Sequence, residues 1–219
     1  MATEFEPRLS ILPEQQRRLW PELSDVPSAF VLCGGTAIAL HLGHRASHDF
    51  DFLAAEEFDP DTLYGQVPFL RDSSTIQKSS STLTCVVERS GPVQVSFFGV
   101  PTIRLINPPL VAPDNGVQIA SLVDLSGMKA AVVQKRAEAK DYLDLDAIIH
   151  RGAIDLSTAL AAARALYGTA FNPELTLKSL CYFGDGNLNT LPQATQDRLV
   201  AAVRSVNLDR LPEIKRQAN

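Results

Sequence analysis

The sequence predicts an α/β domain over residues 1–115, followed by a helical domain over residues 116–219. Two observations indicate this division. Short β-rich runs alternate with helical segments in the first part, and from Ser121 onward the pattern becomes helical. Between the two parts lies an irregular connection, which is punctuated by Pro101, Pro108, Pro109 and Pro113. A chain of 219 residues is long enough for one large domain or for two small ones.

The first elements of the α/β part follow from apolar runs and their boundaries. We expect a short helix over residues 9–23, with Pro21 near its end. The apolar run of residues 29–33 predicts a strand, because it is short and ends at two glycines. A helix over residues 36–42 follows, and a second strand covers residues 49–53.

Turn chemistry predicts the next elements. Asp59 followed by Pro60 is typical of a helix N-cap with proline in the first turn, so a helix is expected through Tyr64. Residues 82–89 and 93–99 are β-rich runs separated by a Ser-Gly-Pro sequence. This arrangement predicts a β-hairpin.

The second part reads as a series of helices. Ser121 with Asp124 three residues later resembles a capping box that opens a helix through about Arg136. Asp124 is therefore interpreted mainly as part of this cap. A further helix is expected over residues 138–150, where Gly152 stops it. The remaining helices are expected near residues 155–167, 172–182 and 192–206.

Composition narrows the class of protein. Hydrophobic residues make up 45% of the chain and charged residues 21%, as in ordinary globular proteins. No apolar stretch approaches the roughly 20 residues that span a bilayer. The first ten residues lack the pattern of a secretory signal, so we expect a cytoplasmic protein without a membrane partner. Three scattered cysteines indicate reduced, buried thiols: Cys33, Cys85 and Cys181.

Charge neither indicates nor excludes a nucleic-acid partner. The net charge is −5, whereas nucleic-acid-binding domains usually carry a basic excess. The densest basic stretch contains Lys129, Lys135, Arg136, Lys140 and Arg151. The favoured interpretation of this stretch is a solvated helical face with intrahelical ion pairs, and a nucleic-acid-binding patch is the alternative.

The second strand contains the first candidates for chemistry. Because side chains alternate along a strand, Asp49 and Asp51 share one face while Phe50 and Phe52 point to the core. The two carboxylates would then have Cα atoms roughly 6.5 Å apart. Such hard oxygen ligands suit Mg²⁺ or Mn²⁺ together with substrate phosphates. The alternative to a metal site is an edge strand whose polar face is simply exposed to solvent.

A glycine turn precedes this strand. Gly34 and Gly35 allow backbone amides to approach a phosphate closely, and Thr36 adds a hydroxyl at the start of a helix. A glycine turn that enters a helix is also common for structural reasons alone. The turn and the two aspartates together supply a phosphate cradle and a metal platform in one short unit.

Two blocks of sequence carry a resemblance to a known family. The first is GGTAIALHLGHRASHDFDFL and the second is SLVDLSGMKAAVVQKRAEAKDYLDLDAI. They resemble the motifs of the AbiEii/AbiGii toxin family, a branch of the polymerase-β-like nucleotidyltransferase superfamily. The resemblance implies a polymerase-β-like core with a mixed sheet, followed by a helical C-terminal bundle.

For the first block, the resemblance implies a nucleotide and metal site. Gly34, Gly35 and Thr36 would hold the phosphates, and Asp49 and Asp51 would bind Mg²⁺ or Mn²⁺. Separately from the resemblance, Arg45 is available to a phosphate. The nearby His41, His44 and His48 could be imagined as zinc ligands, but the segment has no thiolate that would favour zinc.

For the second block, Lys129 would contact the phosphates as a point charge. Lys140, Asp141 and Asp144 belong to a further motif, centred on the Lys-Asp step. A surface ion pair between Lys140 and Asp144 is an open alternative, because the two are i, i+4 neighbours. Asp141 is the stronger functional candidate.

One departure concerns the third carboxylate that polymerase-β-like enzymes usually place on a neighbouring strand. Residues 93–98 are the candidate strand and contain no acid, so Ser96 or Gln94 would occupy that position. Neither side chain acts as a base at neutral pH. Our hypothesis is a single metal ion with Asp141 as the base.

The resemblance implies transfer of a nucleoside monophosphate from an NTP to an acceptor hydroxyl on RNA such as tRNA. The enzyme would be the toxin of a toxin–antitoxin (abortive infection) system. A cognate antitoxin is expected, but it need not contact the toxin. Two alternatives stay open at this point. One is a catalytically impaired protein of this fold that binds nucleotide or a partner, and the other is a transferase that modifies a protein side chain.

Overall fold

The computed structural model describes residues 5–215, so residues 1–4 of the N-terminal stretch interpreted above lie outside it. The chain forms two compact units. The first contains Met1–Arg104 and Pro109–Ala120, and the second contains Leu105–Pro108 and Ser121–Asn219. No helix in the described range is both long and apolar enough to cross a membrane.

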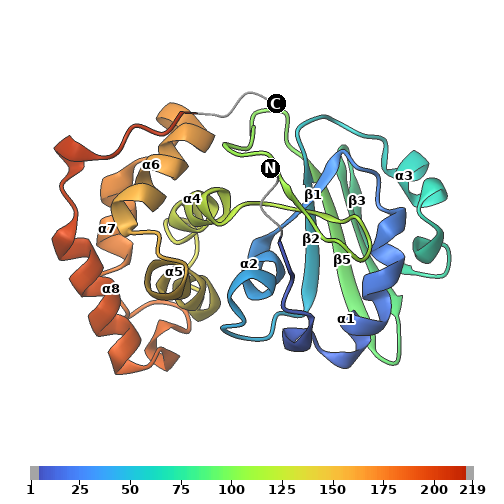
Figure 1. Ribbon diagram of the computed structural model, residues 1–219, viewed down its shortest axis with the longest axis horizontal. Helices are drawn as coiled ribbons and strands as arrows, with labels where there is room; N and C mark the ends of the chain where they lie inside the picture. The colour runs from blue at the N-terminus through green and yellow to red at the C-terminus, as the bar shows by residue number, and fades with distance from the viewer. Residues whose placement is uncertain (1–4, 216–219) are drawn as a thin grey trace. The chain divides into compact units, whose positions relative to one another are not determined.

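The first unit is built around a mixed sheet, as the resemblance predicted (Figure 1). Its described strands lie in the order β3-β4-β5-β2-β1-β7-β6. Their bounds are β1 Phe30–Cys33, β2 Asp49–Ala54, β3 Ser74–Ser79, β4 Thr82–Glu88, β5 Pro92–Gly99, β6 Leu110–Val111 and β7 Gln118–Ile119. Strand β2 is central, because it pairs antiparallel with β1 and parallel with β5.

Helices cover both faces of this sheet, with α2 on one face and α1 and α3 on the other (Figure 1). The α-helices are α1 Glu14–Leu19, α2 Gly34–Leu42 and α3 Pro60–Gln66, and the 3₁₀ turns are η1 Leu9–Ile11, η2 Trp20–Asp25 and η3 Pro68–Leu70. The helix predicted over residues 9–23 is broken into η1, α1 and η2. Pro13 and Pro21 explain the breaks, because each stands where one element gives way to the next.

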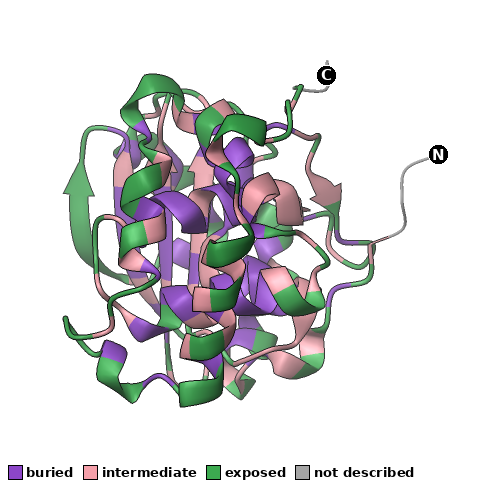
Figure 2. Cartoon of the chain, turned by 90° about the vertical axis from the view of Figure 1, so that its left-hand side faces the viewer, coloured by how far each residue is buried: buried purple, intermediate pink, exposed green. Residues whose placement is uncertain are grey.

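Alternation along β2 separates the core from the site. Phe50 and Phe52 are fully buried, and the ring of Phe50 lies 6.3 Å from that of Trp20 on the α1 side. Phe52 stacks on Phe97 of β5 at 5.3 Å. The aspartates therefore point to the α2 side, as the period of two predicted. In Figure 2 the buried residues, drawn in purple, lie mainly in the interior, and the exposed residues, drawn in green, lie mainly at the surface.

The hairpin predicted over residues 82–99 is confirmed, because β4 pairs antiparallel with β5 along its whole length. The N-cap at Asp59 is confirmed too, since its Oδ2 accepts from Thr62 N at 2.7 Å. Strand β3 was not predicted. All six of its residues are exposed, so no apolar alternation marks it in the sequence.

The second unit consists of helices, as predicted. Its elements are α4 Leu122–Val132, α5 Ala139–Arg151, α6 Leu156–Tyr167, η4 Gly168–Ala170, α7 Pro173–Ser179, η5 Leu188–Thr190, α8 Gln193–Ser205 and η6 Leu208–Arg210. Helices α4 and α6 pack closely, and a Cβ on Gly127 would approach Ala162 C to 2.7 Å. The small buried side chains of Ala130 and Ala159 belong to the same core.

Asp124 does more than cap α4. Ser121 Oγ accepts from Asp124 N at 3.2 Å, which confirms the cap. The Asp124 carboxylate then accepts from the backbone N–H groups of Ile106, at 2.6 Å, and Asn107, at 3.3 Å. These bonds explain why the segment Leu105–Pro108 belongs to the second unit.

The expectation of buried thiols is correct for two cysteines and wrong for the third. Cys33 and Cys85 are buried, whereas Cys181 is exposed, and none of these three cysteines is part of a disulfide. Cys181 lies in the turn just after α7, where the preceding Leu180 takes the buried position.

Candidate active site

The two aspartates of β2 lie beside the start of α2. Cys33, the last residue of β1, is the register partner of Asp51, and α2 begins at the next residue, Gly34. This geometry brings the glycine turn and the carboxylates together, as the sequence predicted. Both Asp49 and Asp51 are half-buried, so their oxygens are accessible to a bound ion.

Gly34 has a backbone conformation that requires glycine. Its φ is +71°, and a Cβ at this position would come within 2.8 Å of Asp51 Oδ2. Helix α2 starts here, and within the described structure its N-cap residue Cys33 makes no side-chain cap. The first N–H groups of a helix have no intrahelical acceptor, so the N–H groups of this turn can bind an anion.

Thr36 fastens the helix to β2. Its side chain is buried, and Thr36 Oγ1 donates to the carbonyl oxygen of Asp49 at 2.5 Å. The hydroxyl proton is therefore directed at the protein backbone and not at solvent. Gly35, between Gly34 and Thr36, is half-buried and leaves its backbone accessible.

The neighbouring strand supplies no third acid. Gln94 pairs in register with Asp49, and Ser96 pairs with Asp51. Ser96 is buried, and Gln94 Nε2 lies 3.5 Å from Ser96 Oγ. Across residues 5–215 no group of three or more His, Cys, Asp and Glu side chains is arranged to hold a metal ion. Two carboxylates are nevertheless enough for Mg²⁺ when substrate phosphates complete its shell.

The last turn of α2 and the loop that follows it contain two more basic residues, His41 and Arg45. Arg45 is half-buried, and its Nη1 donates to the carbonyl oxygen of Ala46 at 2.9 Å. His41 Nε2 lies 2.9 Å from the carbonyl oxygen of Ala120. Burial lowers the pKa of His41, although the hydrogen bond to Ala120 opposes this shift.

In the second unit, Lys129 lies between two buried carboxylates. Lys129 Nζ is 2.6 Å from Asp141 Oδ1 and 2.7 Å from Asp144 Oδ2. The lysine side chain is 8% exposed and both acids are 0% exposed. An ammonium group has three donors, so one remains after these two bonds. The fold thus brings Lys129, Asp141 and Asp144, three candidates from the second sequence block, together in one cluster.

The alternative of a surface ion pair between Lys140 and Asp144 does not fit this arrangement. Asp144 has no exposed surface, whereas Lys140 is half-exposed and lies 3.0 Å from Glu138. A pair on the solvated face of a helix requires both partners at the surface.

Asp141 is also bound by Arg136, a residue of the basic stretch for which no site role was predicted. Arg136 Nε donates to Asp141 Oδ2 at 2.7 Å and Nη2 donates to Oδ1 at 3.1 Å. Burial alone would raise the pKa of Asp141, but Arg136 and Lys129 outweigh it and hold this pKa below its usual value. Both of its oxygens already accept from these two cations, so this arrangement favours a positioning role for Asp141 over the predicted role of base.

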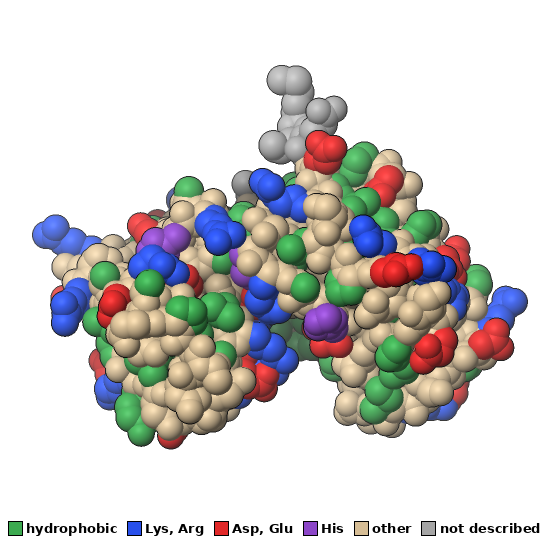
Figure 3. Space-filling model, turned by 90° about the horizontal axis from the view of Figure 1, so that it is seen from below, with side chains coloured by type: hydrophobic (Ala, Val, Ile, Leu, Met, Phe, Trp, Pro, Cys, Tyr) green, Lys and Arg blue, Asp and Glu red, His purple; other side chains and the backbone are tan. Residues whose placement is uncertain are grey.

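The basic stretch of residues 129–151 is not a simple solvated face with intrahelical pairs. Lys129 is buried, and it joins α4 to α5 by its contacts with Asp141 and Asp144. Lys135 and Arg151 are exposed. On the face shown in Figure 3, basic and acidic side chains lie interspersed, and hydrophobic side chains are scattered.

Comparison with known proteins agrees with this fold. A model of the family described as nucleotidyl transferase AbiEii toxin, type IV TA system, matches residues 18–212. An uncharacterised protein of Aquifex aeolicus is 32% identical over 158 residues, which cover 71% of this chain and 74% of that protein.

Two solved structures share the fold at low sequence identity. One, from H. pylori, was assigned as a candidate nucleotidyltransferase; it is 18% identical with a TM-score of 0.51, over 87% of this chain and 91% of that chain. The other is MenT4, a nucleotidyltransferase toxin from Mycobacterium tuberculosis. It is 15% identical with a TM-score of 0.58, over 89% of this chain and 83% of that chain.

Proposed function

This chain belongs to the AbiEii family of nucleotidyltransferase toxins, as its two sequence blocks predicted, and we propose that it transfers a nucleoside monophosphate from an NTP to a hydroxyl of RNA. The reaction releases pyrophosphate and depends on Mg²⁺ or Mn²⁺. One observation carries the proposal. The backbone of Gly34 lies against Asp51 Oδ2, so an anion-binding turn and a cation-binding carboxylate share one small space.

The residues present fit a divalent cation. Asp49 and Asp51 point to the same side of β2, and a Cβ on Gly34 would fill the space beside Asp51. Hard carboxylate oxygens in this number are typical of Mg²⁺ sites that are completed by phosphates. When bound, the ion neutralises the charge that develops as the phosphoryl bond breaks.

The surrounding residues bind and orient the nucleotide. The N–H groups at the start of α2, from Gly34 to Thr36, face the phosphates, and the bond from Thr36 to Asp49 O keeps this turn in place beside β2. Arg45 is half-buried and Lys140 is exposed, and both cations can bind further phosphate oxygens.

The cluster in the second unit supplies a fixed ammonium group as a hydrogen-bond donor. Lys129 contacts the phosphates through its remaining N–H, while Asp141 and Asp144 hold the ammonium group in position. Asp141 is thus a positioning residue, because its two oxygens are engaged by Lys129 and Arg136. This assignment replaces the hypothesis of a base at Asp141.

The acceptor we propose is RNA, with tRNA as the leading candidate, and the place of reaction is the cytoplasm. Because the family is described as part of a type IV toxin–antitoxin system, we also propose a cognate antitoxin, which need not bind the toxin directly. The exposed Lys135 and Arg151 can bind phosphates of such an acceptor without base specificity.

The test incubates the purified protein with total tRNA, Mg²⁺ and each of four α-³²P-labelled NTPs in turn. The Asp49→Ala/Asp51→Ala double variant removes the metal ligands. A matched control is Asp25→Ala/Glu57→Ala, which removes two exposed acids elsewhere on the first unit.

We expect label in RNA with the wild type and the control, and none with the double variant. EDTA should abolish the transfer. Label in protein instead of RNA would contradict the proposed acceptor. Nucleotide binding without transfer to any acceptor would contradict the proposed activity.

A further inference from the structure

The C-terminal end of α2 is held by residues far away in the sequence. Arg8 N donates to Leu40 O at 2.9 Å, and Arg8 Nε donates to His41 O at 3.1 Å. The last carbonyls of a helix have no intrahelical donor, so these bonds satisfy two groups that the helix itself leaves open. The guanidinium charge also lies at the negative end of the helix dipole.

His41 makes a third connection at this end. Its Nε2 lies 2.9 Å from the carbonyl oxygen of Ala120, and Ala120 N in turn donates to Leu32 O of β1 at 3.0 Å. Because the partner of Nε2 is a carbonyl, this nitrogen must carry the proton and donate it. Helix α2 is thereby tied to the end of β7.

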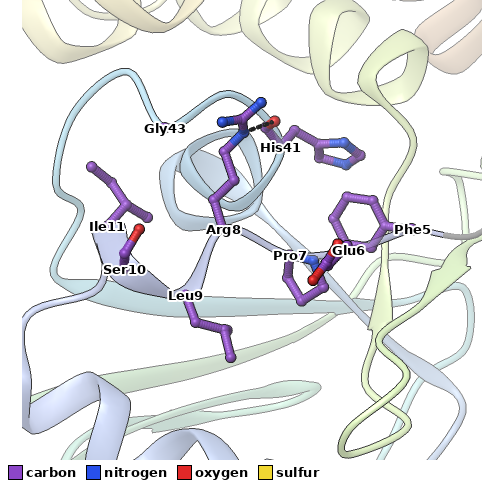
Figure 4. A pocket seen from close by; sticks show the side chains of 9 residues that line it. All are labelled: Phe5, Glu6, Pro7, Arg8, Leu9, Ser10, Ile11, His41 and Gly43. Atoms are coloured by element: carbon purple, nitrogen blue, oxygen red, sulfur yellow. Dashed lines mark hydrogen bonds between the residues drawn. The ribbon is translucent and has the colours of Figure 1, made fainter.

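An open pocket of about 690 Å³ lies beside these bonds and is lined by residues 5–11 with His41 and Gly43. Figure 4 shows the side chain of Arg8 reaching across it to the carbonyl oxygen of His41. Phe5 lies against the His41 ring, with centroids 4.5 Å apart. Because the pocket is open, directed hydrogen bonds hold this end of α2 where close packing does not.

The middle of α2 is held differently. Ala37, Ile38, Ala39 and Leu40 are fully buried, but apolar contacts are not directional. Burial therefore fixes the distance of α2 from the sheet more firmly than its position along its own axis. The bonds made by Arg8 and His41 fix that axial position.

Axial position matters at the other end of the same nine-residue helix. There, Gly34 lies so close to Asp51 that a Cβ would be 2.8 Å from Oδ2, and Thr36 Oγ1 binds Asp49 O at 2.5 Å. A shift of a few tenths of an ångström would disturb both contacts, and a helix transmits such a shift along its length.

We infer that Arg8 and His41 are positioning residues for the phosphate-binding turn Gly34–Thr36, an inference that rests on the proposed function. They do not touch the nucleotide. They hold α2 at the axial position where its first N–H groups and the carboxylates of β2 bind one nucleotide together.

The test compares His41→Leu, which removes the donor, with His41→Gln, whose side-chain N–H can replace Nε2–H. Arg8→Met keeps the length of the side chain and removes the bond to His41 O. The control is Arg18→Met, which removes an exposed arginine that pairs with Glu14 on α1. Two quantities are measured for each variant. One is the dissociation constant for each of four α,β-methylene NTPs with Mg²⁺, by calorimetry. The other is the hydrogen–deuterium exchange of residues 38–42, whose N–H groups lie beyond the first turn of α2.

We expect His41→Leu and Arg8→Met to raise the dissociation constant about 5- to 10-fold, the effect of losing one hydrogen bond. Exchange at residues 38–42 should become faster in both variants. His41→Gln should restore both quantities to near the wild-type values, and Arg18→Met should change neither.

Unchanged binding and exchange in His41→Leu and Arg8→Met would overturn the inference. Equal defects in His41→Leu and His41→Gln would also overturn it, because the bond to Ala120 would not be the cause. If His41→Leu does not fold, Arg8→Met decides. If the wild type binds no nucleotide, the proposed function fails, and exchange alone then decides whether these residues position the turn.

Discussion

The carboxylate of Asp51 lies directly against the backbone of Gly34, close enough that a Cβ on Gly34 would stand 2.8 Å from Asp51 Oδ2. Gly34 also has a φ of +71°, where a side chain is strained. The residue type at position 34 and the position of a metal-binding carboxylate therefore depend on each other.

We expect Gly34→Ala to weaken binding of Mn²⁺ with nucleotide by more than about tenfold, because the new methyl group displaces Asp51. The positive φ also adds backbone strain of roughly 1–2 kcal/mol to the folded state of this variant. Calorimetry measures the binding. The control is Gly65→Ala in α3, where a Cβ meets nothing within 4 Å. Wild-type Mn²⁺ affinity in Gly34→Ala would refute the dependence.

Asp141 should make stability depend on pH at acid values. Burial alone would raise the pKa of Asp141 in the folded chain. Arg136 and Lys129 outweigh burial and hold this pKa below its usual value of 3.8. The ionised form therefore stabilises the fold above about pH 4, and this contribution is lost as pH falls through the lowered pKa. At pH 7, Asp141→Asn should cost about 3–5 kcal/mol, because Lys129 keeps a buried charge with one partner removed.

Urea unfolding between pH 3 and pH 7 measures this effect. The gap in unfolding free energy between wild type and Asp141→Asn should narrow below about pH 4, where Asp141 of the unfolded chain takes up a proton while the folded chain keeps it ionised. Asp25→Asn, at an exposed position, should follow the wild type throughout. A gap that stays constant down to pH 3 would exclude a lowered pKa at Asp141.

These relationships show what the sequence can predict. The alternation of Asp49 and Asp51 with Phe50 and Phe52 is local, so the period of a strand was enough to assign their faces. Strand β3 has no such pattern, because all six of its residues are exposed and only pairing with β4 makes it a strand.

Sequence patterns did not predict the contacts between segments that are far apart along the chain. The Asp124 carboxylate binds Ile106 and Asn107, although its spacing from Ser121 suggested only a local cap. Arg136 binds Asp141 across the start of α5, although the two residues are five positions apart, a spacing that does not indicate a helical ion pair. Packing of α4 on α5 decides which carboxylates meet Lys129.

Gln16 in α1 offers a test of buried polarity. Its side chain is fully buried, and neither amide atom has a hydrogen-bond partner in the described structure. An unpaired buried polar group costs about 1–3 kcal/mol, so Gln16→Leu should raise the free energy of unfolding by an amount in that range. Urea unfolding measures it, with the half-buried neighbour Gln15→Leu as control. A loss of stability in Gln16→Leu would show that the amide is satisfied.

Ser96 explains why we expect one metal ion and not two. It is the register partner of Asp51 on β5, the place where a third carboxylate would stand, and it is 2% exposed. Ser96→Asp should create that carboxylate beside Asp51. Three acids so close repel one another unless a further cation is shared, so the variant should be destabilised without metal and should bind two Mn²⁺ ions with nucleotide.

The control for this change is Thr84→Asp. Thr84 pairs with Ser96 from the next strand, β4, so it lies on the same face about two strand spacings, or roughly 9.6 Å, from Asp51. An acid there adds the same charge but is too far away to share an ion with Asp51. Electron paramagnetic resonance counts bound Mn²⁺, and we expect one ion in the wild type and in Thr84→Asp, against two in Ser96→Asp. Two ions in the wild type would mean that Ser96 does not limit the site, because a ligand other than a third strand carboxylate would then complete the second ion's shell.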